Sequence, residues 1–202
     1  MIEDTPMQIV LASTSPYRAQ QLRDFGLEFT AKAPLFDEEG FKATKLSPSH
    51  LCRTLAFKKA ESLKSTHPND IIIGADQLVS FKKKVLGKPH TRENAIAMLQ
   101  KMSGRTHRLI TSLCVLHKNK IYSKTIIAKI RLRKLSREEV ISYIYRDNPL
   151  DCAGSYKFER SGLSLVQSMS VSDPSSLTGL PLISLTRFLR KTGEPIPFIN
   201  KR

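Results

Sequence analysis

Residues able to bind phosphate are grouped near the start of the sequence. Residues 13–16 read Ser-Thr-Ser-Pro, and Arg18 follows two positions later. Ser15 can cap a helix and Pro16 fits its first turn. A helix that starts after a strand binds anions through its free N–H groups and its dipole. The pattern predicts a phosphate site formed by Ser13, Ser15 and Arg18, although an ordinary capped helix with a surface arginine has the same pattern.

Carboxylates that could activate water or hold a metal occur in two places. Asp76 comes shortly after the apolar run at residues 71–73, so we expect it where a buried strand ends, at the carboxyl edge of a sheet. Asp37 and Glu38 form an acidic pair in an expected loop, and hard divalent cations prefer carboxylate oxygens. The alternatives are an aspartate that caps the turn after its strand and a loop whose acidic side chains are merely solvated.

A lysine on an apolar helix stripe is a further signal. Leu51, Leu55 and Leu63 recur at multiples of four residues, and Lys59 falls on the same stripe. Such a lysine either extends to solvent or reaches into a site. Small residues also stand beside polar ones over residues 151–159, which is typical of close packing at a pocket and equally of a tight turn.

The elements that must position these residues alternate between strands and helices. Apolar runs predict strands at residues 8–12 and 71–73, and alternation predicts a hairpin with arms at residues 107–116 and 121–132. The three lysines at residues 82–84 are expected at the tip of a second hairpin. Start and stop signals predict helices over about residues 16–25, from residue 48, and over about residues 91–102, 136–145 and 182–190. We therefore expect an α/β protein with a mixed sheet.

The composition is that of an ordinary globular protein with a strong positive charge. Lys and Arg total 33 against 18 acidic residues, a formal net charge of +15. Such a field attracts polyanions, but the basic residues are scattered, which is equally typical of a solvated surface. The sequence has three widely spaced cysteines, no long apolar run and an acidic N-terminus. These features predict a cytoplasmic protein that is not associated with a membrane.

Taken in order along the chain, the polar segments resemble the Maf proteins. The resemblance rests on residues 11–18, 37–38, 58–60, 74–77, 87–89, 153–155 and 179–181, and it spans nearly the whole sequence. It implies a fold related to that of the inosine triphosphatases, with an elongated mixed sheet flanked by helices. It also implies one domain over residues 1–202, with two lobes around a central cleft. The implied reaction is hydrolysis of a nucleoside triphosphate to the monophosphate and pyrophosphate, with Mg²⁺, Mn²⁺ or Co²⁺ as cofactor.

The same resemblance implies a role for each polar residue of these segments. The implied phosphate contacts come from Ser13, Ser15 and Arg18, together with the catalytic lysines Lys59 and Lys88. Asp76 is implied to accept the proton of the attacking water, and Glu38 to assist it at the metal, so that both carboxylates are the expected metal ligands. Charge neutralisation and a positioned water are what phosphoanhydride hydrolysis requires.

Three further positions are implied to choose the base. The branch of the family that acts on dTTP and UTP typically has Arg, Thr and Gln there, whereas this chain has Tyr17, Gln77 and Glu159. That set resembles the 7-methyl-GTP branch, in which the first position is commonly Trp. A 7-methylated guanine is cationic, so an aromatic ring adds a cation–π attraction to stacking. Glu159 can accept hydrogen bonds from the guanine N1–H and amino group, and Gln77 can add a polar contact.

Two alternatives remain beside the 7-methyl-GTP enzyme. One is a dTTP/UTP pyrophosphatase of the same family. The other is a basic nucleic-acid-binding or septum-formation regulatory protein, whose binding would survive Asp76→Asn while enzymatic turnover would not. The expected partner is a small nucleotide rather than a nucleic acid, and because the family often forms dimers we expect a homodimer.

Overall fold

The computed structural model describes residues 7–42 and 46–193, and within them seven strands form one mixed sheet. The strands are β1 (Ile9–Ala12), β2 (Thr30–Lys32), β3 (Ile71–Phe81), β4 (Lys84–Leu86), β5 (Thr106–His117), β6 (Lys120–Leu132) and β7 (Val166–Ser170). Their order is β2-β1-β3-β5-β6-β7, and β4 pairs with β3 beside this path. β1 is parallel to β2 and to β3, and the other pairs are antiparallel.

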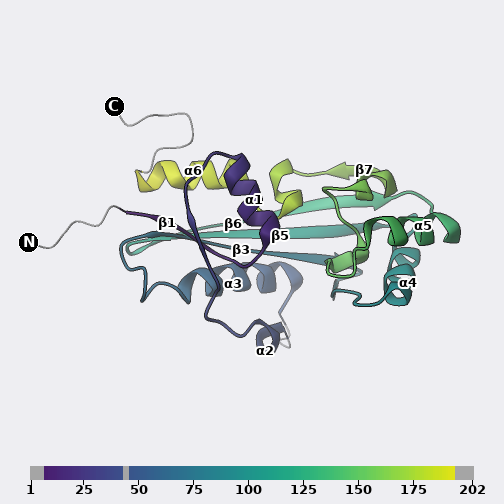
Figure 1. Cartoon of the computed structure of the whole chain (residues 1–202), viewed down its shortest axis with the longest axis horizontal. Helices are drawn as coiled ribbons and strands as arrows, with labels where there is room; N and C mark the ends of the chain where they lie inside the picture. Colours follow the sequence, from purple (N-terminus) through teal and green to yellow (C-terminus); the bar gives the residue numbers. More distant parts are fainter. Residues whose placement is uncertain (1–6, 43–45, 194–202) are drawn as a thin grey trace, which may run out of the picture.

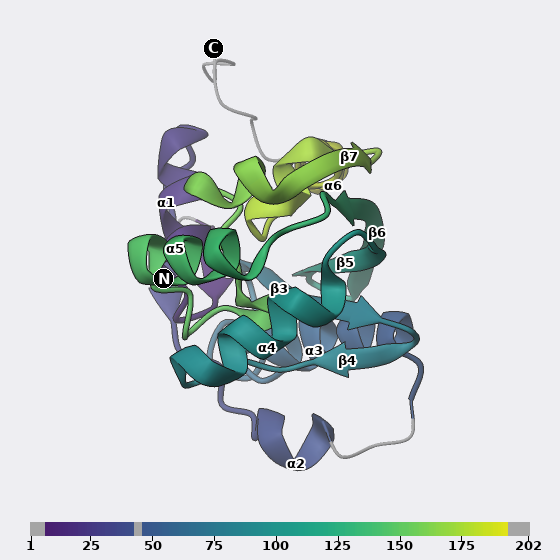
Figure 2. The same ribbon diagram turned by 90° about the vertical axis from the view of Figure 1, so that its right-hand side faces the viewer.

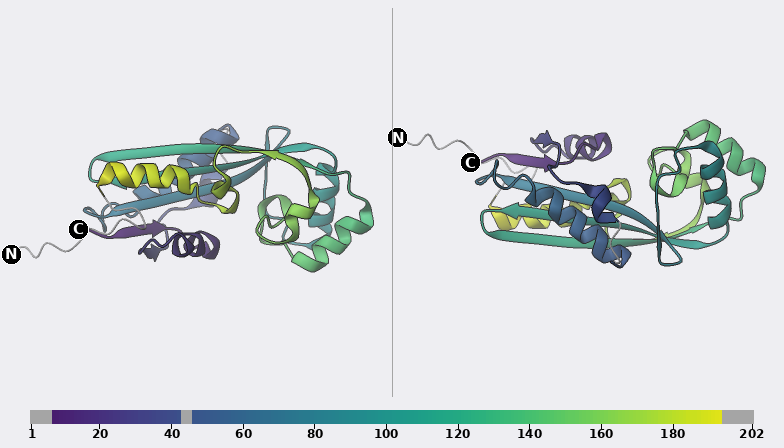
Figure 3. Two further views of the ribbon diagram at one scale, coloured as in Figure 1. Left: turned by 90° about the horizontal axis from the view of Figure 1, so that it is seen from above. Right: turned by 90° about the horizontal axis from the view of Figure 1, so that it is seen from below.

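Helices cover the sheet in separate groups. They are α1 (Pro16–Asp24), α2 (Glu38–Lys42), α3 (Pro48–Glu61), α4 (Arg92–Met102), α5 (Arg137–Asp147) and α6 (Leu182–Thr192), with short 3₁₀ turns η1 (Ala153–Ser155), η2 (Ser161–Leu165) and η3 (Pro174–Thr178). At one end of the long strands, α1 and α6 lie on one face and α3 on the other, whereas α4 and α5 gather at the opposite end (Figures 1 and 3). α2 projects from the body below α3 (Figure 2). The predicted α/β fold with an elongated mixed sheet is confirmed.

The core follows this division. Alternate residues of β3 point to opposite faces of the sheet, as the pleat requires. Ile71 and Ile73 pack with α1 and α6, and Val79 and Phe81 continue that row among residues of α4 and α5. Ile72 packs on the other face, against α3. One face of the sheet therefore carries two groups of helices, with the middle of β3 between them.

Local sequence signals fix the helix ends as predicted. Ser15 caps α1 and Pro16 occupies its first turn. Gly26 follows with φ of 76°, the left-handed conformation that glycine adopts without strain. A capping box opens α5, because the Ser136 side chain accepts from the Glu139 backbone and the Glu139 carboxylate accepts from the Ser136 N–H. Both predicted hairpins are present, with β3 and β4 joined through Lys82 and Lys83 and β5 joined to β6.

One prediction about the strands is wrong. The apolar run at residues 71–73 does not end its strand at Gly74, because β3 continues to Phe81. Asp76 therefore lies within a strand and not in the turn after it. The continuation is held by β5, which pairs with β3 residue by residue from Ile71 to Ser80.

The neighbour on the other edge of β3 changes along its length. β1 pairs with β3 as far as Gly74, and β4 pairs with it from Val79 onward. Among the described strands, residues 75–78 consequently have β5 on one side and no strand on the other. The opening is at the carboxyl end of β1, where an α/β sheet offers a crevice for ligands.

Candidate active site

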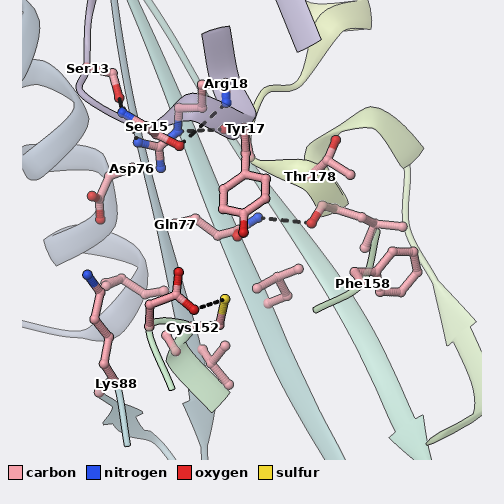
Figure 4. A pocket seen from close by; sticks show the side chains of 18 of the residues that line it. Ser13, Ser15, Tyr17, Arg18, Asp76, Gln77, Lys88, Cys152, Phe158 and Thr178 are labelled. Carbon is pink, nitrogen blue, oxygen red and sulfur yellow. Dashed lines mark hydrogen bonds between the residues drawn. The ribbon is translucent and has the colours of Figure 1, made fainter. Parts of the chain in front are cut away.

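A cleft of about 720 Å³ occupies this opening in the sheet. The β1–α1 loop, α3, β3, the segment after β4, the segment 151–159 and the loop before α6 all contribute to its wall. The ten side chains to which the resemblance assigns a role all line it, whereas Asp37, the other member of the acidic pair, does not. The ten are Ser13, Ser15, Tyr17, Arg18, Glu38, Lys59, Asp76, Gln77, Lys88 and Glu159. Residues that are far apart in the sequence thus meet in one place (Figure 4).

The loop between β1 and α1 forms one end of the cleft. The Ser13 hydroxyl accepts from the Ser15 N–H at 3.1 Å and from Arg18 Nη1 at 3.3 Å. Arg18 Nε donates to the Gly179 carbonyl oxygen at 3.2 Å, so the loop before α6 fixes the direction of the guanidinium. Gly179 has φ of 114°, which suits glycine alone. The arrangement gathers hydroxyl and guanidinium donors at the N-terminus of a helix, a setting that binds anions.

A buried ion pair links α3 to β3 beside this loop. Lys59 and Asp76 are each 5% exposed, and Lys59 Nζ lies 2.7 Å from Asp76 Oδ1. The same ammonium lies 2.9 Å from Glu38 Oε1, at the start of α2. Of the two alternatives for Lys59, the structure shows the one in which the side chain reaches into a site, where it holds two carboxylates together. A buried charge of this kind is stable only when it is paired.

The approach of α3 to β3 depends on Gly74. A Cβ at this position would lie 2.2 Å from the Ala56 carbonyl oxygen and 2.8 Å from the Ala60 nitrogen, both in α3. The helix backbone thus rests directly on the strand backbone, which brings Lys59 within reach of Asp76.

The two carboxylates fit a hard divalent cation that substrate oxygens also bind. Within the described part of the chain, Asp76 Oδ2 is buried and has no hydrogen-bond partner. That oxygen and the Glu38 carboxylate are the hard ligands that Mg²⁺ or Mn²⁺ takes. The described residues include no group of three or more His, Cys, Asp or Glu side chains arranged around one metal position. A cation here would complete its shell with phosphate oxygens and water, as Mg²⁺ in nucleotide sites commonly does.

Lys88 lies across the cleft from the β1–α1 loop (Figure 4). It follows β4 in the segment Gly87-Lys88-Pro89, and its side chain is exposed at the wall of the cleft. An exposed ammonium is free to move toward a bound anion without losing a buried partner. The structure thus places Lys88 on the cleft wall, separate from the buried Lys59.

Tyr17 and Gln77 lie together in the middle of the cleft (Figure 4). Gln77 Nε2 donates to Thr111 Oγ1 at 2.9 Å and to the Ser176 carbonyl oxygen at 2.8 Å. Because a carbonyl can only accept, these contacts fix the amide and leave Oε1 as its acceptor. Partial burial raises the pKa of the Tyr17 hydroxyl, an effect that the Lys157 ammonium opposes. Tyr17 therefore offers a neutral aromatic ring, 38% exposed, beside a fixed acceptor.

The segment 151–159 forms the wall facing Tyr17, and besides Glu159 it contains two charged residues without a role predicted from the sequence, Asp151 and Lys157. Asp151, Cys152 and Glu159 line the cleft. Lys157 Nζ lies 3.3 Å from Asp151 Oδ1. Desolvation acts against the Asp151 carboxylate, but its bond with Lys157 prevails and lowers the pKa on balance. Burial raises the pKa of the Cys152 thiol to about 12, so this side chain is a neutral thiol near neutral pH.

Helix α5 supports that segment from behind. The Lys157 N–H donates to the Tyr143 hydroxyl at 2.9 Å, and the Ser161 N–H donates to the Asp147 carboxylate at 3.0 Å. Asp147 is 4% exposed and also accepts from the Ser161 hydroxyl. These contacts bracket Glu159. These contacts could not be predicted, because nothing in a helix sequence shows which loop its polar face meets.

Known proteins match this chain over most of its length. The family described as "Maf-like protein" matches residues 8–192. The chain belongs to the Maf-like protein family. A relative from Bdellovibrio bacteriovorus named "7-methyl-GTP pyrophosphatase" is 43% identical over 182 residues, 90% of this chain and 95% of that protein.

Two further matches extend the comparison. A relative from Syntrophotalea carbinolica with the same name is 42% identical, over 92% of this chain and 94% of its own length. Among solved structures, the Ham1 protein of Staphylococcus aureus aligns with a TM-score of 0.49 and 13% identity, over 91% of this chain and 98% of that chain. In the described residues of this Maf-like protein, no helix is long and apolar enough to cross a membrane.

Proposed function

We propose that this Maf-like protein is a hydrolase that converts 7-methyl-GTP to 7-methyl-GMP and pyrophosphate. The observation that carries the proposal is one cleft with two parts: donors for phosphate with a buried carboxylate beside them, which we call the phosphate end, and an aromatic ring with hydrogen-bond acceptors, which we call the base end. The names of the relatives, at 43% and 42% identity over most of both chains, support the same substrate.

The base end suits a methylated guanine. The Tyr17 ring can stack on the base, and a cationic ring gains a cation–π attraction that neutral guanine lacks. Gln77 Oε1 and the Glu159 carboxylate are acceptors, and a guanine edge offers an N1–H and an amino group as donors. Uracil and thymine offer one ring N–H, so one of these acceptors would remain unsatisfied, which disfavours them.

The phosphate end suits hydrolysis between the α- and β-phosphoryl groups. Arg18 and the exposed Lys88 neutralise charge on the triphosphate oxygens, and the Ser13 hydroxyl can donate a hydrogen bond that helps to hold the phosphates in place. Asp76 takes a proton from a water that attacks the α-phosphorus, and the bond to the pyrophosphate oxygen breaks. Lys59 fixes the position of the Asp76 carboxylate, since its Nζ lies 2.7 Å from Asp76 Oδ1. A divalent cation held by Glu38 and Asp76 would supply further neutralisation of phosphate charge.

Two further expectations belong to the proposal. The three cysteines are free, which fits a reducing compartment such as the cytoplasm. A homodimer stays a prediction from the family resemblance.

The test is pyrophosphate release from 7-methyl-GTP, GTP, dTTP, UTP, CTP and ATP, each with Mg²⁺, Mn²⁺ or Co²⁺. We expect preferential turnover of 7-methyl-GTP. Asp76→Asn should lower kcat by about 10²–10⁴-fold, the usual contribution of a general base. Glu28→Gln removes a charge from an exposed position outside the cleft and is the matched control.

The base assignment has its own variant. Changing Tyr17→Arg, Gln77→Thr and Glu159→Gln together should abolish the preference for 7-methyl-GTP. If the wild-type protein prefers dTTP or UTP, the base assignment is refuted, whereas the assignment as a hydrolase still stands. Absence of turnover with every nucleotide and metal, in a folded protein, would refute the enzyme.

A further inference from the structure

The base end of the cleft holds three charges rather than one. Asp151 and Glu159 both line it. The Lys157 ammonium lies 3.3 Å from Asp151 Oδ1 on a side chain only 10% exposed. All three act on the Tyr17 hydroxyl, where Lys157 lowers the pKa and the two carboxylates raise it. The ring on which the base would stack is therefore within the field of each of them.

Lys157 cannot easily leave this position. Its N–H donates to the Tyr143 hydroxyl at 2.9 Å, and its carbonyl oxygen accepts from the Gly162 N–H at 3.1 Å. Its backbone is tied on both sides, and its side chain is nearly covered. A fixed ammonium at this end would repel a positively charged base unless a carboxylate compensated it.

We propose that Asp151 is a specificity-determining residue that selects a cationic purine base over its neutral counterpart by neutralising Lys157. The inference rests on the proposed function, and it addresses a problem left by that function. Guanine and 7-methylguanine present the same hydrogen-bonding edge to Gln77 and Glu159, so these two residues do not separate them well. Discrimination between the two nucleotides must therefore depend on the charge of the base. With Asp151 present, the three groups sum to one negative charge beside the ring; without it they sum to zero.

The size of the effect of Asp151 on selectivity depends on how exposed its side chain is to solvent. The Asp151 side chain is 61% exposed, so solvent and salt screen its interaction with a bound base. Lys157 is screened less, because its side chain is largely covered. We expect Asp151→Asn to lower the preference for 7-methyl-GTP over GTP by about three- to tenfold, chiefly because kcat/KM for the cationic substrate falls.

The experiment measures kcat/KM for 7-methyl-GTP and for GTP and compares their ratio across variants. Asp151→Asn should lower the ratio. Lys157→Met, which removes the opposing charge and keeps much of the side-chain volume, should raise it. The double variant should return toward the wild-type ratio. Glu28→Gln, which changes the net charge equally but lies outside the cleft, should leave the ratio unchanged. The nucleosides 7-methylguanosine and guanosine lack phosphate and can be tested as inhibitors. Inhibition by 7-methylguanosine relative to guanosine should weaken in Asp151→Asn and strengthen in Lys157→Met.

Opposite shifts in the two single variants distinguish an electrostatic role from a structural one, because loosening the segment would impair both variants in the same direction. A wild-type enzyme that prefers 7-methyl-GTP, with ratios that do not move or that fall in both variants, would overturn the role of Asp151 and leave the proposed function intact. A wild-type enzyme without that preference would overturn the proposed function itself. Melting curves of each variant show whether it is folded.

Discussion

Adding one methyl group at Gly74 should damage both the stability and the activity of this protein. Gly74 lies in β3 under the C-terminal half of α3. A Cβ there would stand 2.2 Å from the Ala56 carbonyl oxygen and 2.8 Å from the Ala60 nitrogen. Both atoms belong to the helix backbone, so no side chain can rotate away to make room. The Gly74→Ala variant must therefore push α3 off the sheet.

The magnitude follows from this geometry. Overpacking a core costs about 1–3 kcal/mol and sometimes more, and a clash between two backbones belongs at the upper end, about 3 kcal/mol. In a domain of this size each kcal/mol lowers Tm by about 2–4 °C, so we expect a fall of about 6–12 °C. To restore normal contact α3 must move by about 1 Å, and a misplacement of that size can cost about 10²-fold in rate. Lys59 moves with α3, away from Asp76.

The assay combines thermal unfolding with kcat for pyrophosphate release, measured well below the lowered Tm. Gly87→Ala is the control for stability, because a Cβ at Gly87 meets nothing within 4 Å. Adding Ala60→Gly should not rescue the variant, since the nearest contact is the Ala56 carbonyl oxygen. A Gly74→Ala protein with the Tm and kcat of the wild type would refute the argument that the direct approach of the two backbones sets the position of Lys59.

Three other perturbations test separate parts of the structure. Asp147→Ala removes the acceptor of Ser161 behind the base-binding segment; it should raise KM more than it lowers kcat and cost about 1–3 kcal/mol by denaturant unfolding. Burial lowers the pKa of His107 from 6.5 to about 4, so the unfolded chain takes up a proton first as the pH falls. Stability should then decrease by about 3 kcal/mol from pH 6.5 to 4, and unfolding curves of His107→Gln should lack that component. Lys129 stands directly opposite Arg108 on paired strands, so Lys129→Glu should raise stability by about 0.2–1 kcal/mol, a gain that 1 M salt should remove.

Much of the local structure could be predicted from the sequence because its signals act over a few residues. The capping box at Ser136 and Glu139 and the helix start at Ser15 and Pro16 satisfy backbone groups within one turn. The turn at Lys82 and Lys83 is enforced by the antiparallel pairing on either side of it. In each case the residues that determine the structure are neighbours in the chain.

The course of β3 through the site could not be predicted in this way. Gly74 and Ala75 after an apolar run are typical of a strand that ends, whereas β3 continues because β5 pairs with it up to Ser80. That pairing joins residues 28 to 46 positions apart in sequence. Gly74 is present for the approach of α3 and not for a turn. Tertiary contacts override local preference here, as they commonly do in strands.

The continuation of the strand has a consequence for how the site is built. Neighbouring residues of a strand point to opposite faces, so Asp76 turns toward Lys59 on α3 while Gln77 turns toward the Ser176 carbonyl on the other face. A turn at this point would impose no such separation. The strand thus directs the carboxylate and the amide into different parts of one cleft, and the gap between β1 and β4 opens the edge of β3 to both. A shift of one residue in the β3–β5 register would exchange the two side chains. The register of two long strands therefore determines which end of the cleft is suited to catalysis and which to the base.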